Sequence, residues 1–127
     1  MTSEDKELLL KDLCARFPYR VKVQYDNQVC KLVVINDDYT VLLLGEDGYK
    51  PNIEDDLFLN IEKVKPYLRL MSSMTEEEMT EYKHFVAFSG NPTGSANFID
   101  WLNAHHFDYR GLISKGLALE APEGMYN

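Results

Sequence analysis

The spacing of the apolar residues changes from about four to two at Pro18, and no other feature constrains the fold as much. Before Pro18 the apolar positions recur on one side of a helix that Ser3 is expected to cap. The stripe consists of Leu9, Leu13 and Phe17, widened by Leu10 and Cys14. Since proline cannot continue a helix, the helix is expected to end near residue 18. The chain is therefore predicted to begin with a one-sided helix.

Short strands are predicted after this helix. Val21, Val23 and Tyr25 alternate with polar residues, as in a strand with one face in water. Two further runs, 29–35 and 40–44, are apolar on both faces over most of their length. Strands of this kind are covered on both sides, so we expect another element, such as the first helix, to lie over the sheet.

Tight turns are expected between these runs, because Asp, Asn and Gly gather there. The turn signals lie at 26–27, 36–38 and 45–48, and a polar excursion at 49–56 precedes the next apolar alternation at Leu57, Leu59 and Ile61. The run 64–68 closes the section. Four or five short strands within about 50 residues indicate a small curled antiparallel sheet or an SH3-like barrel.

The C-terminal part has the signals of helices. Thr75 and Glu78 have the spacing of a capping box, and Met74 and Met79 that of a hydrophobic staple. The apolar face of this second helix is predicted to consist of Met79, Tyr82, Phe85 and Val86. The segment 90–94 combines two glycines with a proline, which indicates a hinge.

A third helix is expected to start at Ser95 or Asn97 and to carry Phe98, Ile99, Leu102 and His105 on one side. Asp108 is predicted to cap a short fourth helix that stops at Gly116. If Gly116 is the left-handed residue of a Schellman motif, Leu117 folds back onto Leu112. The tail from Ala121, with its proline and glycine, is expected to be loosely held.

These elements together predict an α+β fold. We expect a single domain over residues 1–127. Its parts are an N-terminal helix at 1–18, a small antiparallel sheet or SH3-like barrel at 19–70, and a helical C-terminal part at 71–127 packed on the sheet.

Charge and composition narrow the function classes. The formal net charge is −8, divided into −3 for residues 1–70 and −5 for residues 71–127. Such a surface repels phosphate backbones, so nucleic-acid binding is disfavoured. No apolar run approaches the roughly 20 residues of a membrane-spanning helix, and the acidic start MTSEDK lacks the basic region of a signal peptide. We therefore expect a cytoplasmic protein without a membrane partner, in which Cys14 and Cys30 are buried reduced thiols.

The chemistry-bearing residues give little sign of catalysis. His105, His106 and Asp108 invite a metal or acid–base interpretation, but adjacent helical residues point about 100° apart and cannot form a ligand pair. We expect His105 to pack against the core and His106 to cap the helix as a partly cationic imidazole. The serines lack a G-x-S-x-G frame, Cys14 lies in an apolar helix, and the acidic run 54–56 is typical of a solvated loop. The sequence therefore predicts no enzymatic activity, no cofactor and no metal site.

Two strings of the sequence support a resemblance. They are SSMTEEE from Ser72 and IDWLNAHHFDYRGLI-x-KGLALEAPEGMY from Ile99. On these strings the chain resembles a family of short uncharacterised proteins encoded by gut anaerobic bacteria and by their phages and mobile elements. That family has no established activity, so the resemblance implies no site residues. The chain departs from its pattern at Arg20, where glycine is usual, and at Leu70, where proline is usual, which puts the local turns in question.

Aromatic residues and an arginine gather near the end of the chain, and such residues often anchor protein contacts. Trp101, His106, Tyr109 and Arg110 are the predicted interaction residues. We therefore expect a non-enzymatic interaction module, an accessory protein of a phage or mobile element, whose barrel recognises a macromolecule. Replacing Tyr109 or Arg110 with alanine is expected to leave the melting temperature nearly unchanged.

Two alternative functions remain open. The first is a small-ligand or nucleotide-binding protein with a pocket between the sheet and the C-terminal helices. Its lining residues would be Tyr67, Trp101, His105 and Arg110. The second is a nucleic-acid-associated small barrel, which requires the available cations to lie on one face. Those cations are Arg20, Lys22, Lys31, Lys63, Lys65 and Arg69.

Overall fold

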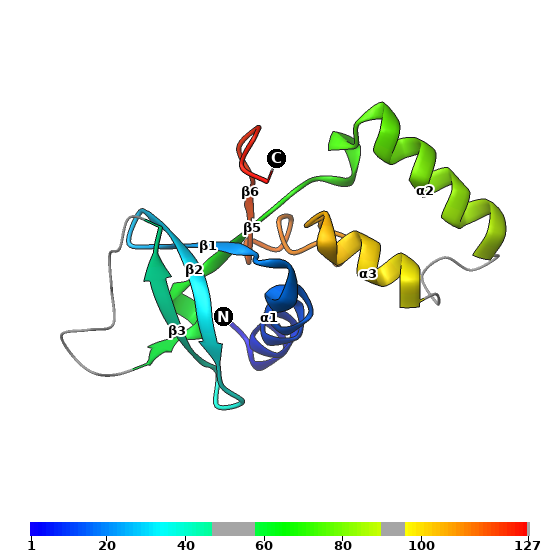
Figure 1. Ribbon diagram of the computed structural model, residues 1–127. Coiled ribbons are helices and arrows are strands. Elements are labelled where there is room, and N and C mark those ends of the chain that lie inside the picture. The colour runs from blue at the N-terminus through cyan, green and yellow to red at the C-terminus, as the bar shows by residue number, and fades with distance from the viewer. Residues whose placement is uncertain (47–57, 90–95, 127) are drawn as a thin grey trace.

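The computed structural model has an α+β architecture, which confirms the predicted fold class. It describes residues 1–46, 58–89 and 96–126. An N-terminal helix lies against a curled sheet, and two further helices lie side by side at the other end of the molecule (Figure 1). The polar excursion at 49–56, the hinge at 90–94 and a cap at Ser95 lie outside the described residues.

The helix α1 (Ser3–Arg16) begins one residue earlier than predicted. Thr2 and not Ser3 is the N-cap, because the Thr2 side chain accepts from the Asp5 N–H and the Asp5 carboxylate accepts from the Thr2 N–H. Leu9 and Leu13 are buried as expected. Phe17, which opens the 3-10 turn η1 (Phe17–Tyr19), is 41% exposed, so its predicted place in the buried stripe is wrong.

In the part of the chain that the structure describes, the sheet has six strands in the order β4-β3-β2-β1-β5-β6. Neighbouring strands pair antiparallel except β5 and β6, which are parallel. The antiparallel prediction therefore holds for the first five strands, and the sixth is a parallel addition from the tail. The strands are β1 (Lys22–Tyr25), β2 (Gln28–Ile35), β3 (Thr40–Gly45), β4 (Leu59–Asn60), β5 (Lys65–Leu68) and β6 (Leu119–Glu120), with the 3-10 turns η2 (Ile61–Lys63) and η3 (Met71–Ser73) between them.

The hairpin between β1 and β2 follows directly from its turn residues. Asp26 and Asn27 both have positive φ, 51° and 60°, which is the backbone of a tight two-residue hairpin turn. This turn sets the register, in which Tyr25 faces Gln28 and Lys22 faces Lys31.

The two faces of the sheet are unequal, contrary to the prediction that both are covered. On the face toward α1, Val23, Cys30, Val41 and Leu43 are fully buried together with Leu9 and Leu13 of the helix. The alternate positions of β3 are only half-buried, and Val33, at a register shift in β2, is 44% exposed. Only one face therefore carries the main core.

The cysteines differ from expectation in one respect. Cys30 is buried in the sheet, but Cys14 is exposed on α1. The prediction of two buried thiols is therefore wrong for Cys14, because the buried side of the helix runs through Asp12 and Arg16 instead.

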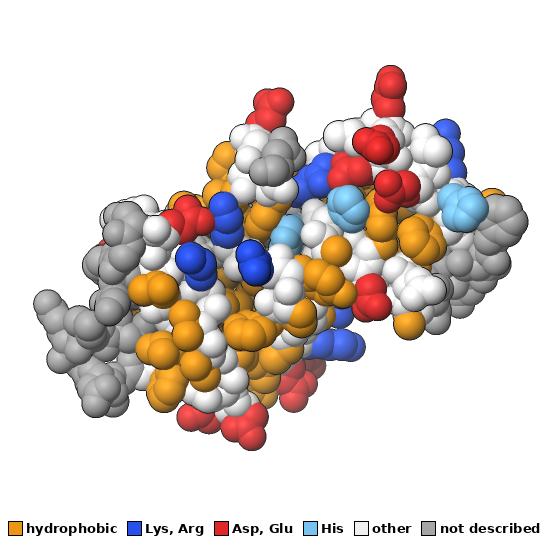
Figure 2. Space-filling model, in the orientation of Figure 1, with side chains coloured by type: hydrophobic (Ala, Val, Ile, Leu, Met, Phe, Trp, Pro, Cys, Tyr) orange, Lys and Arg blue, Asp and Glu red, His pale blue; other side chains and the backbone are white. Residues whose placement is uncertain are grey.

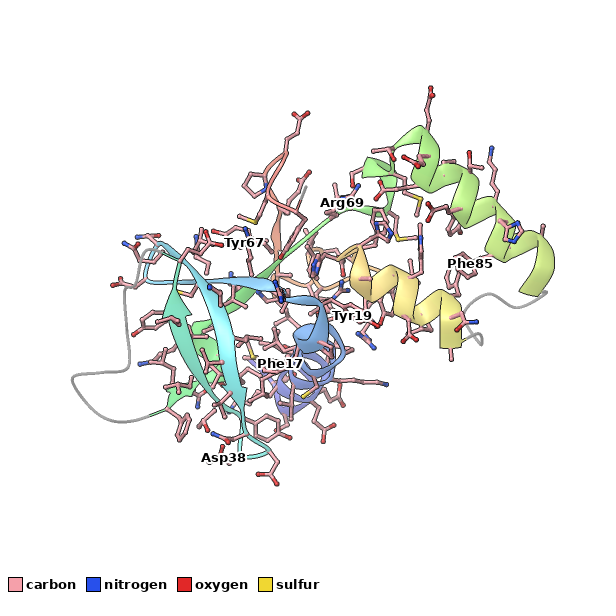
Figure 3. The ribbon with its side chains drawn as sticks, in the orientation of Figure 1. Phe17, Tyr19, Asp38, Tyr67, Arg69 and Phe85 are labelled. Atoms are coloured by element: carbon pink, nitrogen blue, oxygen red, sulfur yellow. The ribbon has the colours of Figure 1, made fainter. Side chains whose placement is uncertain are left out.

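The helices α2 (Glu76–Ser89) and α3 (Ala96–Ala104) share a second core cluster around Phe98, Leu102 and Phe107. The predicted capping box is confirmed, since Glu78 N–H donates to Thr75 Oγ1 and Thr75 N–H donates to Glu78 Oε1. Tyr82 and Phe85 pack on this cluster, and Phe85 lies on the side of α2 toward α3 (Figure 3). Met79 and Val86 are 37% and 42% exposed, so they do not belong to the packed face.

The segment from Asp108 to Gly116 contains consecutive turns at 112–116 and not the predicted fourth helix. Its cap is as expected, because the Asp108 carboxylate accepts from the N–H groups of Leu112 and Ile113. The Schellman motif is confirmed, with φ of +75° at Gly116 and a 3.0 Å bond from Leu117 N–H to Leu112 C=O.

The tail is held firmly, which corrects the expectation that it is loose. The Tyr126 hydroxyl donates to Tyr67 C=O at 2.7 Å and accepts from Lys22 N–H at 2.9 Å. The Tyr126 ring stacks on His106 with centroids 3.9 Å apart. The end of the chain thereby fastens β1 to β5.

Candidate interaction surface

The predicted interaction residues near the end of the chain are tied into the fold. The Trp101 indole N–H donates to Glu81 Oε2 at 2.6 Å, and its ring packs against Phe85 and Phe98. It is half-buried and borders a shallow hollow on α2. Trp101 is therefore largely a packing residue that joins α2 to α3.

The two histidines have different environments. His105 Nδ1 lies 2.9 Å from Glu78 Oε2, and its ring packs 4.7 Å from Trp101. His106 is 4% exposed and has φ of 60°, the left-handed residue of a second Schellman motif in which Phe107 N–H donates to Leu102 C=O. His106 therefore presents no side-chain surface to a partner.

The imidazole of His106 is neutral, which contradicts the expectation of a partly cationic cap. Burial and, to a smaller extent, the nearby Arg16 guanidinium lower the pKa of His106 to about 4. Its Nδ1 is a buried atom with no hydrogen-bond partner within the described residues. What stabilises the helix end here is the backbone of His106, not its charge.

Tyr109 and Arg110 join a buried polar network. Arg110 donates to Asp12 Oδ1 at 2.8 Å and lies over the Tyr109 ring, while the Tyr109 hydroxyl donates to Asn103 Oδ1. Removing either side chain leaves a buried polar partner behind, so we now expect destabilisation where the sequence suggested none.

The centre of this network was not anticipated from the sequence. Asp12 and Arg16 are fully buried, 2.9 Å apart, and Arg16 also donates to Phe107 C=O at 2.6 Å. The sign available in the sequence was that Asp12 and Arg16 are four residues apart on the same helix face as Leu9 and Leu13. The network joins α1 to the C-terminal segment, and removing one of its charged partners would leave an uncompensated buried charge.

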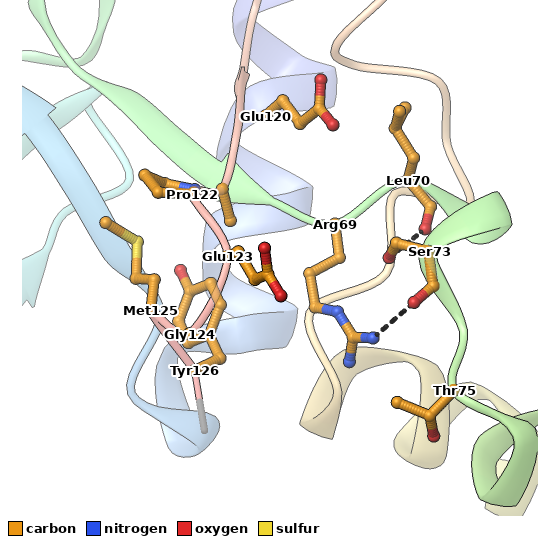
Figure 4. Close-up of a pocket in the computed structure, with 11 residues that line it drawn as sticks. Arg69, Leu70, Ser73, Thr75, Glu120, Pro122, Glu123, Gly124, Met125 and Tyr126 are labelled. Carbon is orange, nitrogen blue, oxygen red and sulfur yellow. Dashed lines mark hydrogen bonds between the residues drawn. The ribbon is translucent and has the colours of Figure 1, made fainter.

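A cavity of about 390 Å³ lies between the tail and the segment after β5 (Figure 4). Its one cation, Arg69, donates to both carboxylate oxygens of Glu78, at 2.7 and 2.8 Å, and to Ser73 C=O. These hydrogen bonds lower the pKa of Glu78 to about 2. Because Arg69 is already paired with Glu78, and Glu120 and Glu123 also border the cavity, the charges around it disfavour an anion.

The residues proposed to line a ligand pocket bond to partners in different parts of the fold. Arg110 bonds to Asp12 on α1, Trp101 to Glu81 on α2, and Tyr67 to Gln24 and Tyr126. They therefore do not converge as the small-ligand hypothesis requires.

Half of the six cations considered for a nucleic-acid face do gather in one place. They surround a hollow of about 590 Å³ where the end of α1 meets β1 and β2, which we call the basic hollow. Its lining residues are Phe17, Pro18, Arg20, Val21, Lys22, Lys31, Leu32 and Glu46. Lys22 is paired with Glu46 at 3.0 Å, whereas Arg20 and Lys31 form no side-chain ion pair or hydrogen bond within the described part of the chain.

An apolar surface lies beside the basic hollow. Leu42 and Val34 are paired in register, and like Leu44 they alternate with residues of the core, so they point to the sheet face away from α1. Together with the exposed Val33 they make up what we call the outer patch. Figure 2 shows apolar side chains gathered over β2 and β3 and cationic side chains next to them.

Comparison with known proteins gives no match: no family model, no curated protein and no solved structure matches the chain. None of the described helices has the length and apolar character needed to cross a membrane. Within the described residues, no three His, Cys, Asp or Glu side chains are grouped so that they could hold a metal ion.

Proposed function

We propose that this protein is a non-enzymatic interaction module that docks a protein partner on the outer patch. The observation that supports the proposal is the apolar outer face of β2 and β3, bordered by the cations of the basic hollow, on a chain of net charge −8. Apolar side chains gathered on an otherwise charged surface are typical of contact sites.

The rest of the fold suits the role of a rigid support. The opposite face of the sheet is filled by α1, and the register shift at Val33 turns an apolar side chain outward. The polar network of Asp12, Arg16 and Arg110 fixes the C-terminal segment to α1. The outer patch would therefore be preformed, so that binding a partner there would cost little entropy for ordering this protein.

The biological setting is part of the proposal and is supported by the sequence resemblance alone. We propose a cytoplasmic accessory protein of a phage or mobile element. The partner is then a macromolecule of the host cell or of the element itself.

Site-specific photo-crosslinking tests the docking surface. A photoreactive phenylalanine analogue replaces Val33 on the outer patch, and Val86, equally exposed on α2, serves as the matched control position. In cells that carry the gene, we expect a discrete crosslinked species from position 33 and none from position 86.

Thermal melting of both labelled proteins shows that each is folded before crosslinking. Equal yields from the two positions, or no species from position 33, would contradict docking on the outer patch. A species only from position 86 would move the contact to α2.

A further inference from the structure

We infer that the docked partner contributes an acidic segment, held by Arg20, Lys22 and Lys31 at the basic hollow, with an apolar side chain inserted among Phe17, Val21 and Leu32. This inference rests on the proposed function and adds the chemistry of the partner. Four features of the hollow support it: the left-handed backbone of Arg20, the opposed lysines of β1 and β2, the apolar lining and the local positive charge.

The first cost is the backbone of Arg20. Its φ is 61° and ψ 47°, a left-handed conformation that glycine adopts freely and most other residues adopt rarely. The side chain is exposed, so no packing within the described residues explains why arginine stands there. Strain of this kind is often retained where the side chain has a function, and here the function is a cation at the mouth of the hollow.

The second cost is the pairing of like charges. Lys22 and Lys31 lie directly opposite one another on β1 and β2, an arrangement that destabilises a sheet. Glu46 relieves only part of this repulsion, since it pairs with Lys22 at 3.0 Å. An incoming carboxylate near Lys31 and Arg20 removes the remainder.

The apolar lining of the hollow requires that the acidic segment also carry an apolar side chain. Phe17 is 41% exposed at the hollow, although it is a large aromatic that would normally be buried. Figure 3 shows it at α1, to the right of β2 in this view. A volume of about 590 Å³ accommodates one large apolar side chain with room for neighbouring backbone.

Protein carboxylates fit better than a nucleic-acid backbone. At physiological ionic strength charges interact over only about 8 Å, so the three cations create a local positive region on an acidic protein. A short acidic segment remains inside that region. An extended polyanion runs onto the remaining surface, where the net charge of −8 repels it.

The test measures fluorescence anisotropy with a labelled peptide in which a phenylalanine is flanked on both sides by Glu and Asp. The same peptide with Lys in place of every acidic residue is the control ligand. We expect saturable binding of the acidic peptide that weakens with salt, and about a fivefold loss of affinity in Arg20→Gly and in Lys31→Glu. Lys83→Glu on the exposed side of α2 is the matched control variant and is expected to bind like the wild type.

Arg20→Gly separates function from folding. Glycine relieves the left-handed backbone, so the variant should be as stable as the wild type or more so, while its affinity for the acidic peptide falls. If the role of Arg20 were purely structural, stability and binding would not change in opposite directions.

Several outcomes would overturn the inference. They are failure of the acidic peptide to bind, equal affinity in Lys31→Glu, preferential binding of a single-stranded oligonucleotide, and self-association of the chain by light scattering with loss of peptide binding. If crosslinking from position 33 persists unchanged in Arg20→Gly and Lys31→Glu, the docking surface stands and only the acidic partner is wrong. If crosslinking from position 33 is absent throughout, both are wrong.

Discussion

The role of a residue in this molecule depends on burial more than on residue type. Arg16, Arg69 and Arg110 are all engaged by carboxylates, whereas Arg20 is exposed without an ion-pair partner in the described part of the chain. The same side chain is therefore structural in three positions and available for binding in one. A similar contrast separates His105, bound to Glu78, from the buried and neutral His106.

The buried His106 makes stability depend on pH. Its pKa is about 4 in the folded protein, below the ordinary value of about 6.5, so the unfolded chain takes up a proton first. Its contribution is complete above pH 6.5 and is lost as the pH falls toward 4, a loss of on the order of 3 kcal/mol at most. In His106→Asn, which tolerates the left-handed backbone, we expect a much smaller difference between urea unfolding at pH 7 and at pH 4.

The carboxylate of Glu78 does not obscure this measurement. Its pKa is lowered from 4.5 to about 2, so its contribution is present above pH 4.5 and begins to be lost by pH 4; this loss is the same in the wild type and in His106→Asn and cancels in their comparison. An equal pH dependence in the wild type and in His106→Asn would show that His106 is not the titrating group.

At the scale of the elements, left-handed residues end two consecutive segments, α3 and the turns at 112–116. His106 ends α3, and Gly116 ends the turns that follow it. Each reverses the chain so that the next residue, Phe107 or Leu117, returns to the core. Only the left-handed residue at Gly116 was predictable, because glycine commonly adopts this conformation at the end of a helix and histidine rarely does.

Replacing Gly116 with alanine tests this geometry without a steric complication. Its φ is +75°, and an added Cβ meets no atom within 4 Å, so the whole cost is conformational. We expect the free energy of unfolding to fall by about 1 kcal/mol, measured by urea denaturation. Gly116→Asn is the matched variant and should cost less, and a neutral Gly116→Ala would indicate that the turn is not left-handed.

At the scale of the whole molecule, the described residues form two core clusters. One lies between α1 and the sheet, and the other between α2 and α3. The polar network around Asp12 and the Tyr126 hydroxyl connects segments that are about 100 residues apart. These long-range contacts decide how the sheet and the helical part are joined.

Local signals in the sequence predicted the elements well. The hairpin at Asp26 and Asn27, the capping box at Thr75 and the Schellman motif at Gly116 each need only a few adjacent residues. The burial of Arg16 and the strand β6 depend on partners far along the chain, which periodicity does not reveal. The basic hollow could not be predicted from the sequence either, since Lys22 and Lys31 come together only through the register of β1 and β2.

The Tyr126 contact is testable by removing one oxygen atom. Tyr126→Phe keeps the ring that stacks on His106 but leaves the Lys22 N–H and the Tyr67 C=O without this partner. We expect a loss of about 1–3 kcal/mol in the free energy of unfolding, measured by urea denaturation. Tyr82→Phe on α2 is the control, and equal effects of the two changes would argue that the Tyr126 hydroxyl contributes nothing to the fold.

The bond between Tyr126 and the start of β1 also has a kinetic consequence. The two residues are 104 positions apart, so at a synthesis rate of roughly 5–20 residues per second the first strand waits about 5–20 s for its partner. During that interval the nascent hairpin of β1 and β2 is formed while its neighbours on the far edge are still missing. The sheet of this protein is therefore completed only once β6 and Tyr126 have been synthesised, and its first strands must stay out of aggregates until then.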